Sequence, residues 1–378
     1  MRSNPCIIIS AARNNDHTIS FGVIELSKLH TKGEHIMGIT TKDLAQLCGV
    51  SRTTVHRALY GGGRIHPDTK EMILRVAKEH DYRPDLLARG LVKGRTYYIG
   101  VVVMDVRNRY FAGMLSAIGR EAAQHGYNIN ITLHDNNRKF EQDQLTRLSS
   151  YRMDGIILSS VNEGPEYAKF LESLETPIVT VDNKIADGIP FVSIDQRAAM
   201  REAVEHILEM KKYERIVFVC PAMAVAGEQN IYVHRERKKG FEEAMTGAPG
   251  VQAEYVLNWE YLKQVEKLAQ DGIRTAFACT ADDFALDIMK YLKEKGLRTP
   301  ADYGIVGFDN VDTLKYITPQ LVTVSNKVDA VAKAAVQMLF ALIDAGQEQA
   351  DEKAQAAEQE VQRRIQILPP ELIDGETL

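Results

Sequence analysis

Side chains that suit contacts with DNA bases recur within residues 52–57. Arg52, Thr53, His56 and Arg57 fall on one face of a predicted helix, while the apolar residues between them fall on the other. A guanidinium group can donate two parallel hydrogen bonds to guanine, and threonine can bond a base or contact the thymine methyl group. The pattern is typical of a helix that enters the major groove of DNA.

Hydroxyl groups flank this helix at positions that suit phosphate contacts. Thr40, Ser51 and Thr54 lie at or near predicted helix N-termini, where hydroxyls and backbone N–H groups can bind phosphate oxygens. We also assign Tyr60, at the end of the same helix, to the DNA interface. The alternative is a helical domain whose polar face is merely hydrated, but Gly49, the capping serine and the basic face together favour DNA binding.

Three short helices must position these residues. Thr40 or Thr41 can cap the first, Gly49 can form the turn before the second, and Pro67 opens the third where proline is tolerated. Each helix is predicted to bury one apolar face, formed by Leu44, Ala45 and Leu47 in the first, by Val55, Ala58 and Leu59 in the second, and by Met72, Ile73, Val76 and Ala77 in the third.

From residue 98 onward, apolar runs alternate with amphipathic helices. The runs form two series, at 98–104, 127–133, 155–159 and 178–182, and at 216–220, 255–257, 276–280 and 303–308. Continuous apolar strands between helices indicate parallel sheets with helices on both faces. The sequence therefore predicts a small all-α helix-turn-helix domain followed by an α/β body of two similar lobes, with a ligand cleft outside the strand C-termini.

The charge of the chain is divided unevenly between these parts. Residues 38–95 hold 11 Lys and Arg against 6 Asp and Glu, whereas residues 96–378 hold 31 against 42. A basic head on an acidic body fits a phosphate-binding module attached to a second function.

Cysteine usage and hydropathy predict a cytoplasmic protein. The four cysteines, Cys6, Cys48, Cys220 and Cys279, are far apart and form no C-x-x-C pair, which favours inert reduced thiols. No apolar run is long enough to span a bilayer, and the early run at residues 6–10 is too short for a signal peptide.

Residues 1–37 show no sustained hydrophobic period, and we expect a non-native or disordered extension. Met37 directly precedes the first helical pattern, and the codons of Lys32, Gly33 and Glu34 can spell a purine-rich ribosome-binding sequence. Translation is therefore expected to start at Met37. A genuine disordered arm is the alternative.

Residues 39–378 resemble the LacI/GalR (lactose/galactose repressor) family. The head segment ITTKDLAQLCGVSRTTVHRALYGGGRIHP is followed in order by YRPDLLARGL, IGVVV, NRYF, DGIIL, RKKGF, GLRTPADYGIVGFDN and ITPQLVTV. The resemblance implies a sequence-specific DNA-binding transcriptional regulator, expected to be a repressor, with a periplasmic-binding-protein-like body. It implies no enzyme activity, cofactor or metal. The expected partners are a pseudo-palindromic operator, a sugar or sugar derivative, and a second copy of the chain.

The resemblance implies that residues 84–91, which precede the body, form a hinge helix. Leu91 would push into a central base step from the minor groove, beside Ala88 and Arg89. A helix this short is marginal by itself, so the sensing domain could shift its order. Asp85 and Gly90 depart from the family pattern, and a simple linker is the alternative.

The resemblance also implies which residues contact the effector. They are Tyr110, Phe111, Asp182, Arg237, Trp259, Asp309 and Asn326. Charged groups can bond hydroxyls, and aromatic faces can stack on a sugar ring. Asn326 replaces a common Gln, and Ala281 replaces the first residue of the usual Asn-Asp pair, so the identity of the effector stays open. For Trp259 packing is the alternative, and Asp282 is expected to cap the following helix.

These observations divide the chain into four parts. They are an extension at 1–37, a helix-turn-helix domain at 38–83, a hinge at 84–96 and an effector-binding and dimerisation domain at 97–378, with lobe 1 at about 97–196 and 325–346 and lobe 2 at about 197–323 and 362–375.

Two other function classes fit less well. An enzyme is disfavoured because the sequence has no P-loop, no G-x-S-x-G and no metal-spaced His/Cys cluster. A solute-binding protein of a transporter would share the two-lobed body, but it needs a secretion signal and no basic head.

Overall fold

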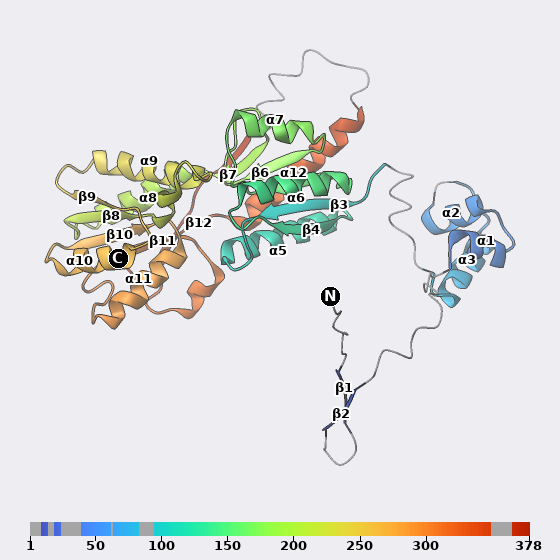
Figure 1. The fold of residues 1–378 in the computed structure, drawn as a ribbon, viewed down its shortest axis with the longest axis horizontal. Coiled ribbons are helices and arrows are strands. Elements are labelled where there is room, and N and C mark those ends of the chain that lie inside the picture. The colour runs from blue at the N-terminus through green and yellow to red at the C-terminus, as the bar shows by residue number, and fades with distance from the viewer. Residues whose placement is uncertain (1–8, 14–18, 24–38, 62, 83–93, 349–364) are drawn as a thin grey trace, which may run out of the picture. The chain divides into compact units, whose positions relative to one another are not determined.

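A computed structural model of the chain describes residues 9–13, 19–23, 39–61, 63–82, 94–348 and 365–378. The chain forms two compact units, residues 1–89 and residues 90–378. The first contains the predicted helical head, and the second contains the predicted α/β body (Figure 1).

Two short strands pair antiparallel within the N-terminal extension. Strand β1 (Ile9–Arg13) pairs with β2 (Ile19–Val23), and Ile9 lies opposite Val23. We expect a non-native or disordered extension here; these ten residues are ordered as strands, and the non-native origin of the extension stays a prediction.

Three helices form the head, as predicted: α1 (Thr41–Leu47), α2 (Arg52–Tyr60) and α3 (Pro67–Glu79). Leu44, Val55 and Ile73, one from each helix, are fully buried at the centre of its core. Gly49 adopts the left-handed conformation expected in the turn, with φ of 64°. The prediction for Leu47 was wrong: its side chain is 53% exposed, because it ends α1 on a turn that leaves the core.

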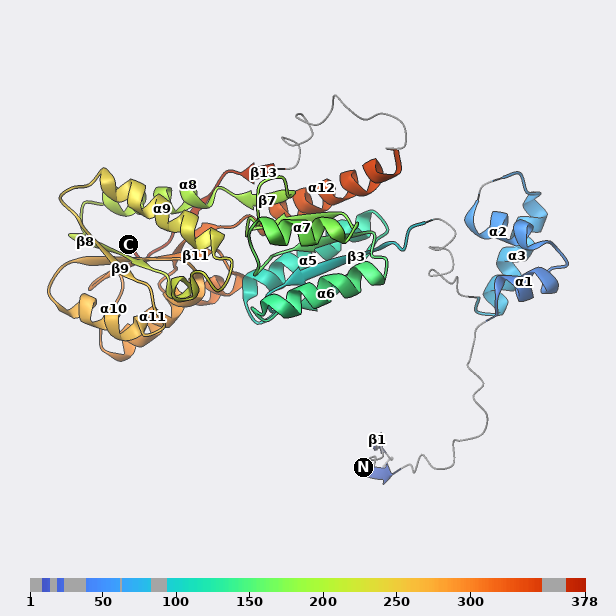
Figure 2. The ribbon, with the colours of Figure 1, turned by 45° about the horizontal axis from the view of Figure 1, so that its top comes forward.

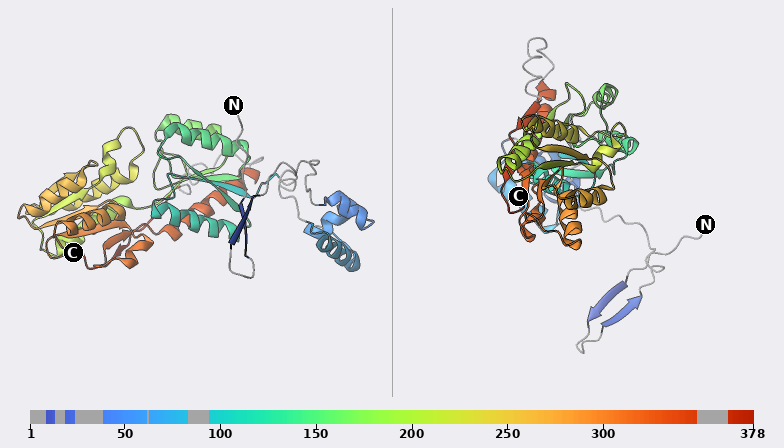
Figure 3. Two further views of the ribbon diagram at one scale, coloured as in Figure 1. Left: turned by 60° about the horizontal axis from the view of Figure 1, so that its bottom comes forward. Right: turned by 90° about the vertical axis from the view of Figure 1, so that its left-hand side faces the viewer.

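The first lobe contains a parallel six-stranded sheet. Its strand order is β13 (Ile365–Leu368), β7 (Phe191–Ile194), β6 (Ile178–Val181), β5 (Gly155–Leu158), β3 (Tyr98–Val103) and β4 (Asn128–Leu133). Helices α5 (Arg109–Gln124) and α12 (Val328–Glu348) cover one face, and α6 (Arg138–Ser150) and α7 (Pro165–Ser173) cover the other (Figures 2 and 3).

The second lobe repeats this plan. Its strand order is β14 (Leu372–Ile373), β12 (Val322–Ser325), β11 (Gly304–Asp309), β10 (Thr275–Cys279), β8 (Arg215–Val219) and β9 (Gln252–Val256), and only β14 runs antiparallel to its neighbour. The covering helices are α8 (Gln196–Glu209) and α9 (Tyr232–Thr246) on one face and α10 (Tyr261–Gln270) and α11 (Asp282–Glu294) on the other, with short 3-10 turns η2 (Pro221–Val225) and η3 (Asp312–Tyr316).

Among the described elements, the chain passes from one lobe to the other after β7, after β12 and after β13. The third crossing lies later than predicted. We had placed all of 362–375 in the second lobe, but β13 pairs with β7 of the first lobe and only β14 joins the second sheet. The apolar pattern of a strand does not indicate which sheet it will join. The sequence therefore could not distinguish the edge of the first sheet from that of the second.

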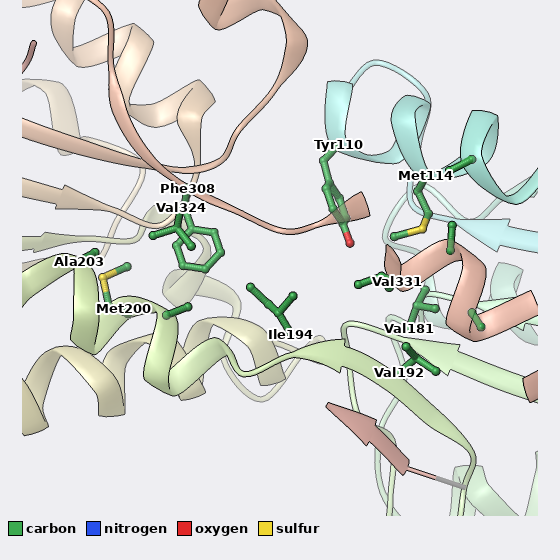
Figure 4. Close-up of a cluster of buried hydrophobic side chains, with 14 of the residues drawn as sticks. Tyr110, Met114, Val181, Val192, Ile194, Met200, Ala203, Phe308, Val324 and Val331 are labelled. Carbon is green, nitrogen blue, oxygen red and sulfur yellow. The ribbon is translucent and has the colours of Figure 1, made fainter. Parts of the chain in front are cut away.

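A continuous apolar core runs through the region of the crossings. Figure 4 shows Phe308 and Met200 of the second lobe near Ile194, which ends β7, with Val181 and Met114 of the first lobe beyond it. The polar groups described below are therefore held by two sheets that share one packed core. Among the described helices, none is long and apolar enough to cross a membrane.

The expectation of buried free thiols holds for two cysteines. Cys220 and Cys279 are fully buried at the ends of β8 and β10, and burial raises the pKa of both thiols. Cys48 in the head is half-buried and also free.

Candidate nucleic-acid interface and ligand site

Helix α2 presents the predicted base-reading residues to solvent. Ser51 caps it: the Ser51 Oγ accepts a hydrogen bond from the Thr54 amide at 3.1 Å, and the two hydroxyl oxygens lie 2.9 Å apart. Val55 and Ala58 are buried in the head core, which turns the opposite face outward. The side chains exposed there are those of Arg52, Thr53, His56 and Arg57.

Two of these side chains also make contacts inside the head. The His56 and Tyr60 rings lie 4.9 Å apart, centroid to centroid. The Arg57 side chain crosses Gly63, where a Cβ atom would come within 3.0 Å of its Nε. A glycine at that position therefore leaves room for the outer part of the Arg57 side chain.

Thr40 is tied into the start of α1. Its hydroxyl donates to Asp43 Oδ2 at 2.7 Å, and the Asp43 amide donates back to Thr40 Oγ1 at 3.3 Å. Hydrogen bonds from Thr40 lower the pKa of the Asp43 carboxyl, so this carboxylate carries its charge at the helix N-terminus. A phosphate contact by Thr40 would have to accommodate that charge, and this assignment stays a prediction. The predicted hinge residues Ala88, Arg89 and Leu91 lie outside the described residues.

In the body, the first polar pair of the predicted effector site lies in the first lobe. Asp182 follows β6 in a left-handed conformation, with φ of 61°, and Tyr110 lies in the first turn of α5. The buried Tyr110 hydroxyl donates to Asp182 Oδ2. Burial raises the pKa of Asp182 to about 6, although the tyrosine bond acts in the opposite direction.

The second lobe contributes Arg237, on α9, to this site. Its buried guanidinium donates from Nε to Gln196 Oε1 at 2.8 Å and from Nη1 to the Thr280 carbonyl at 2.5 Å. Its Cζ lies 3.5 Å from the centre of the Phe308 ring. Desolvation lowers the pKa of Arg237, but the planar group remains the charged partner of the nearby carboxylates.

Asp309 and Asn326 complete the cluster. Asp309 ends β11 with φ of 115°, and its Oδ1 lies 3.9 Å from Arg237 Nη2. Asn326 follows β12 and donates from Nδ2 to the same Asp309 oxygen at 2.6 Å. Burial raises the pKa of Asp309 well above its ordinary range, and Arg237 opposes that effect. The structure thus brings together five of the seven predicted effector residues.

Two buried polar atoms at this site have no hydrogen-bond partner in the described part of the chain. They are Asn326 Oδ1 and His234 Nδ1, and His234 lies one turn before Arg237 on α9. Burial, reinforced by the arginine charge, lowers the pKa of His234 to about 3. A neutral imidazole nitrogen and an amide oxygen can both accept a hydrogen bond, so the site retains capacity to bind a donor.

The two remaining aromatic candidates differ in position. Phe111 packs edge-on against Tyr110, with ring centres 5.3 Å apart, and lies beside the cluster. The Trp259 side chain is 60% exposed and contacts Phe284 edge-on, so it is neither a core residue nor a member of the buried cluster. Its predicted contact with an effector stays untested.

Asp282 has a structural role that we had not predicted. It does not cap α11, since no side-chain cap is present there. Its buried carboxylate instead accepts from Thr323 Oγ1 at 2.6 Å and from the Val311 amide at 2.9 Å, which ties α11 to β12 and to the loop after β11. Gln196, Thr280 and His234 also went unpredicted. Thr280 directly follows β10, and Gln196 follows the crossover after β7. These positions were the only sequence signal that could have pointed to them.

A two-lobed ligand-binding body joined to a helix-turn-helix head defines a DNA-binding transcriptional regulator. Residues 40–85 match the family described as "Bacterial regulatory proteins, lacI family", and residues 204–378 match a periplasmic binding protein-like domain. The chain belongs to the LacI family of transcriptional regulators, which are not enzymes.

Individual relatives support this assignment along most of the chain. Catabolite control protein A of Priestia megaterium is 30% identical over 312 residues, covering 80% of this chain and 92% of that protein. The transcriptional repressor PurR of Haemophilus influenzae (strain PittEE) is 29% identical over 314 residues, covering 80% and 90%. The lac repressor dimer bound to operator and the anti-inducer ONPF has the same fold, with a TM-score of 0.74 at 23% identity, covering 90% of this chain and 98% of that one.

Proposed function

We propose that the chain is a cytoplasmic repressor whose affinity for a pseudo-palindromic operator is set by a sugar or sugar derivative bound between the two lobes. The observation that carries this proposal is the buried polar cluster. Asp182 and Tyr110 come from the first lobe, Arg237 and Asp309 from the second, and Asn326 from a crossing segment. A ligand that bonds to both halves would favour one arrangement of the lobes over another.

The chemistry of the cluster suits a polyhydroxylated ligand. Carboxylates accept hydrogen bonds from hydroxyl groups, and Arg237 donates to oxygen. Asn326 Oδ1 and His234 Nδ1, which have no partner in the part of the chain that the structure describes, are further acceptors. Among structural relatives, one was solved with D-xylulofuranose, one with cellobiose and one with ribose. These ligands belong to those proteins, and they give the first compounds to try here.

DNA binding is assigned to the exposed face of α2 and, through the family resemblance, to Ala88, Arg89 and Leu91 of the hinge. In this proposal the α2 residues recognise the base sequence of the operator. Formation of the hinge helix determines whether two heads can bind side by side. A coupling of about 1–3 kcal/mol between effector and operator would make a useful switch.

The test combines a mobility shift with a thermal shift. The full chain is incubated at low salt with DNA from upstream of its gene, with and without neutral sugars, sugar phosphates and nucleobases. We expect specific binding that one class of compound changes. If no specific complex forms under any of these conditions, the regulator function is wrong.

Thermal shifts of variants test whether the effector binds at the buried polar cluster. A compound that binds only the folded protein raises Tm. Asp309→Asn should remove this increase, measured against the ligand-free Tm of the variant itself. Asp312→Asn changes an exposed carboxyl three residues away and should retain it. Equal responses of the two variants would contradict the proposed site.

A further inference from the structure

Direct hydrogen bonds join the two lobes on one side of the body. Asn230, which lies before α9 in the second lobe, donates from its amide to the Val161 carbonyl of the first lobe at 2.8 Å. Its Nδ2 donates to the carbonyl oxygens of Asn162 at 3.1 Å and Lys184 at 3.2 Å. Its Oδ1 accepts from the Tyr232 amide at 3.1 Å. Both polar atoms of this side chain are thus bonded although the residue is only 5% exposed, and Nδ2 makes both of its bonds across the lobes.

An ion pair reinforces this contact at the surface. Arg235, in the first turn of α9, meets Glu163 of the first lobe with two parallel hydrogen bonds, from Nη1 to Oε1 at 3.1 Å and from Nη2 to Oε2 at 2.5 Å. The paired geometry makes it stronger than a single-contact surface ion pair. Between these two contacts, the Val233 amide donates to Asn183 Oδ1 at 3.3 Å.

A buried carboxylate supports the first-lobe loop, residues 159–163, that takes part in this contact. Glu141 of α6 is fully buried and accepts from the Ser160 hydroxyl at 2.7 Å, the Val161 amide at 2.8 Å and Asn162 Nδ2 at 2.9 Å. The Tyr167 hydroxyl adds a fourth bond at 2.5 Å. Because these bonds lie within one lobe, the loop at 159–163 can keep its shape whether or not the second lobe is in contact.

We propose that residues 229–235 of the second lobe and residues 159–163 and 183–184 of the first form an interlobe clasp, which holds the two lobes together on this side of the body through protein groups alone. The clasp needs no ligand to bridge the lobes. It therefore sets the balance between closed and open forms on which the proposed function rests, and an effector must act against it or add to it.

Hydrogen–deuterium exchange on the full chain, without DNA or effector, tests the clasp directly. The Asn230 amide bonds across the lobes, whereas the Val161 amide bonds within the first lobe to Glu141. Exchange is read at both amides by mass spectrometry with residue-level fragmentation. In Glu163→Gln and in Arg235→Gln we expect exchange at Asn230 to rise about tenfold, as for loss of a charged hydrogen bond, while Val161 keeps its protection.

Two further variants make the result decisive. Glu166→Gln removes an equivalent charge from an exposed pair with Lys169 inside the first lobe and should leave Asn230 unchanged. The exchanged pair Glu163→Arg with Arg235→Glu should restore protection at Asn230. The clasp is overturned if neither single variant accelerates Asn230, or if Asn230 and Val161 accelerate together, which would report local unfolding. Because the measurement uses no DNA, its failure leaves the regulator function standing.

Discussion

At the scale of single residues, the body concentrates ionisable groups where water is excluded. Asp182, Asp309 and Arg237 lie within one buried cluster, and Asp282 lies close behind it. Burial raises the pKa of each of these carboxyls, and the Arg237 guanidinium opposes that effect at Asp182 and Asp309. Such a cluster costs folding stability, and ionisable groups with shifted pKa values are concentrated at functional sites.

The pH dependence of stability should reveal this cost. The pKa of Asp182 rises from 3.8 to about 6 on folding, so between these values the folded form holds a proton that the unfolded form has lost. This residue therefore makes the free energy of unfolding fall as pH rises through that window, by at most about 1.4 kcal/mol per pH unit.

His134 and His234 act in the opposite sense, because burial lowers their pKa values. The informative quantity is thus the difference between the wild type and Asp182→Asn, measured by urea unfolding at pH 4.5 to 7. The difference should change with pH in the stated direction. The exposed Asp187→Asn serves as the control, and a pH-independent difference for Asp182→Asn would contradict the burial of its charge.

Two head residues should affect DNA binding in different ways. Arg57→Ala removes an exposed guanidinium that suits a base edge, and we expect it to cost about 1–3 kcal/mol at one base position and to relax the preference there. Thr54→Ala removes a hydroxyl assigned to phosphate, so binding should weaken to a similar degree on all sequences. Selection of binding sites from a random library measures both. Equal losses of preference would refute the assignment.

At the scale of elements, close packing between helices positions the arginine of the cluster. Helices α8 and α9 approach so closely at Gly240 that a Cβ atom there would lie 2.1 Å from the Arg197 carbonyl oxygen. Gly240 is three residues after Arg237 on α9, and Gln196, which orients the guanidinium, begins α8. The glycine thus sets the distance between the donor and acceptor of one of the bonds that fix the site.

Gly240→Ala should destabilise the body by about 1–3 kcal/mol, since a backbone atom cannot move aside as a flexible side chain can. Gly119→Ala in the middle of α5 is the matched control: the nearest atom to its added Cβ is a side-chain methyl at 3.4 Å. Helix propensity should make that change neutral or stabilising by up to about 1 kcal/mol. Urea unfolding of the full chain compares them, and equal effects would rule out the close α8–α9 contact as the cause.

At the scale of the whole molecule, the expected switch requires two copies of the chain. One head has a short reading helix and one small core, which suits a single half-site. The body has a net negative charge, so in the proposed mode of binding two heads held together provide the affinity and the register.

Sedimentation should therefore give twice the chain mass of 42.3 kDa. An operator with one half-site scrambled should bind at least about tenfold more weakly, because each mismatched base pair costs about 1–3 kcal/mol. Full and half operators are compared by mobility shift at one salt concentration. A monomer in solution with equal affinity for both DNAs would exclude the paired mode of binding.

The sequence by itself determined the local features of this protein. The caps, Gly49 and the apolar spacing located the helices of the head, since these signals act within a few residues. Strand and helix periods defined the two-lobed body, and family motifs located Arg237 and Asp309.

Only the tertiary structure decided which distant groups meet. It placed Gln196 and Thr280 on Arg237 and assigned β13 to the first sheet, and it left Asn326 Oδ1 and His234 Nδ1 without a hydrogen-bond partner among the residues described. It also joined Asn230 to the loop at 159–163. These pairings depend on which sheet edge a strand joins and on how closely helices approach, and they link residues far apart in the chain. Hydrophobic periodicity is a local pattern and predicts neither.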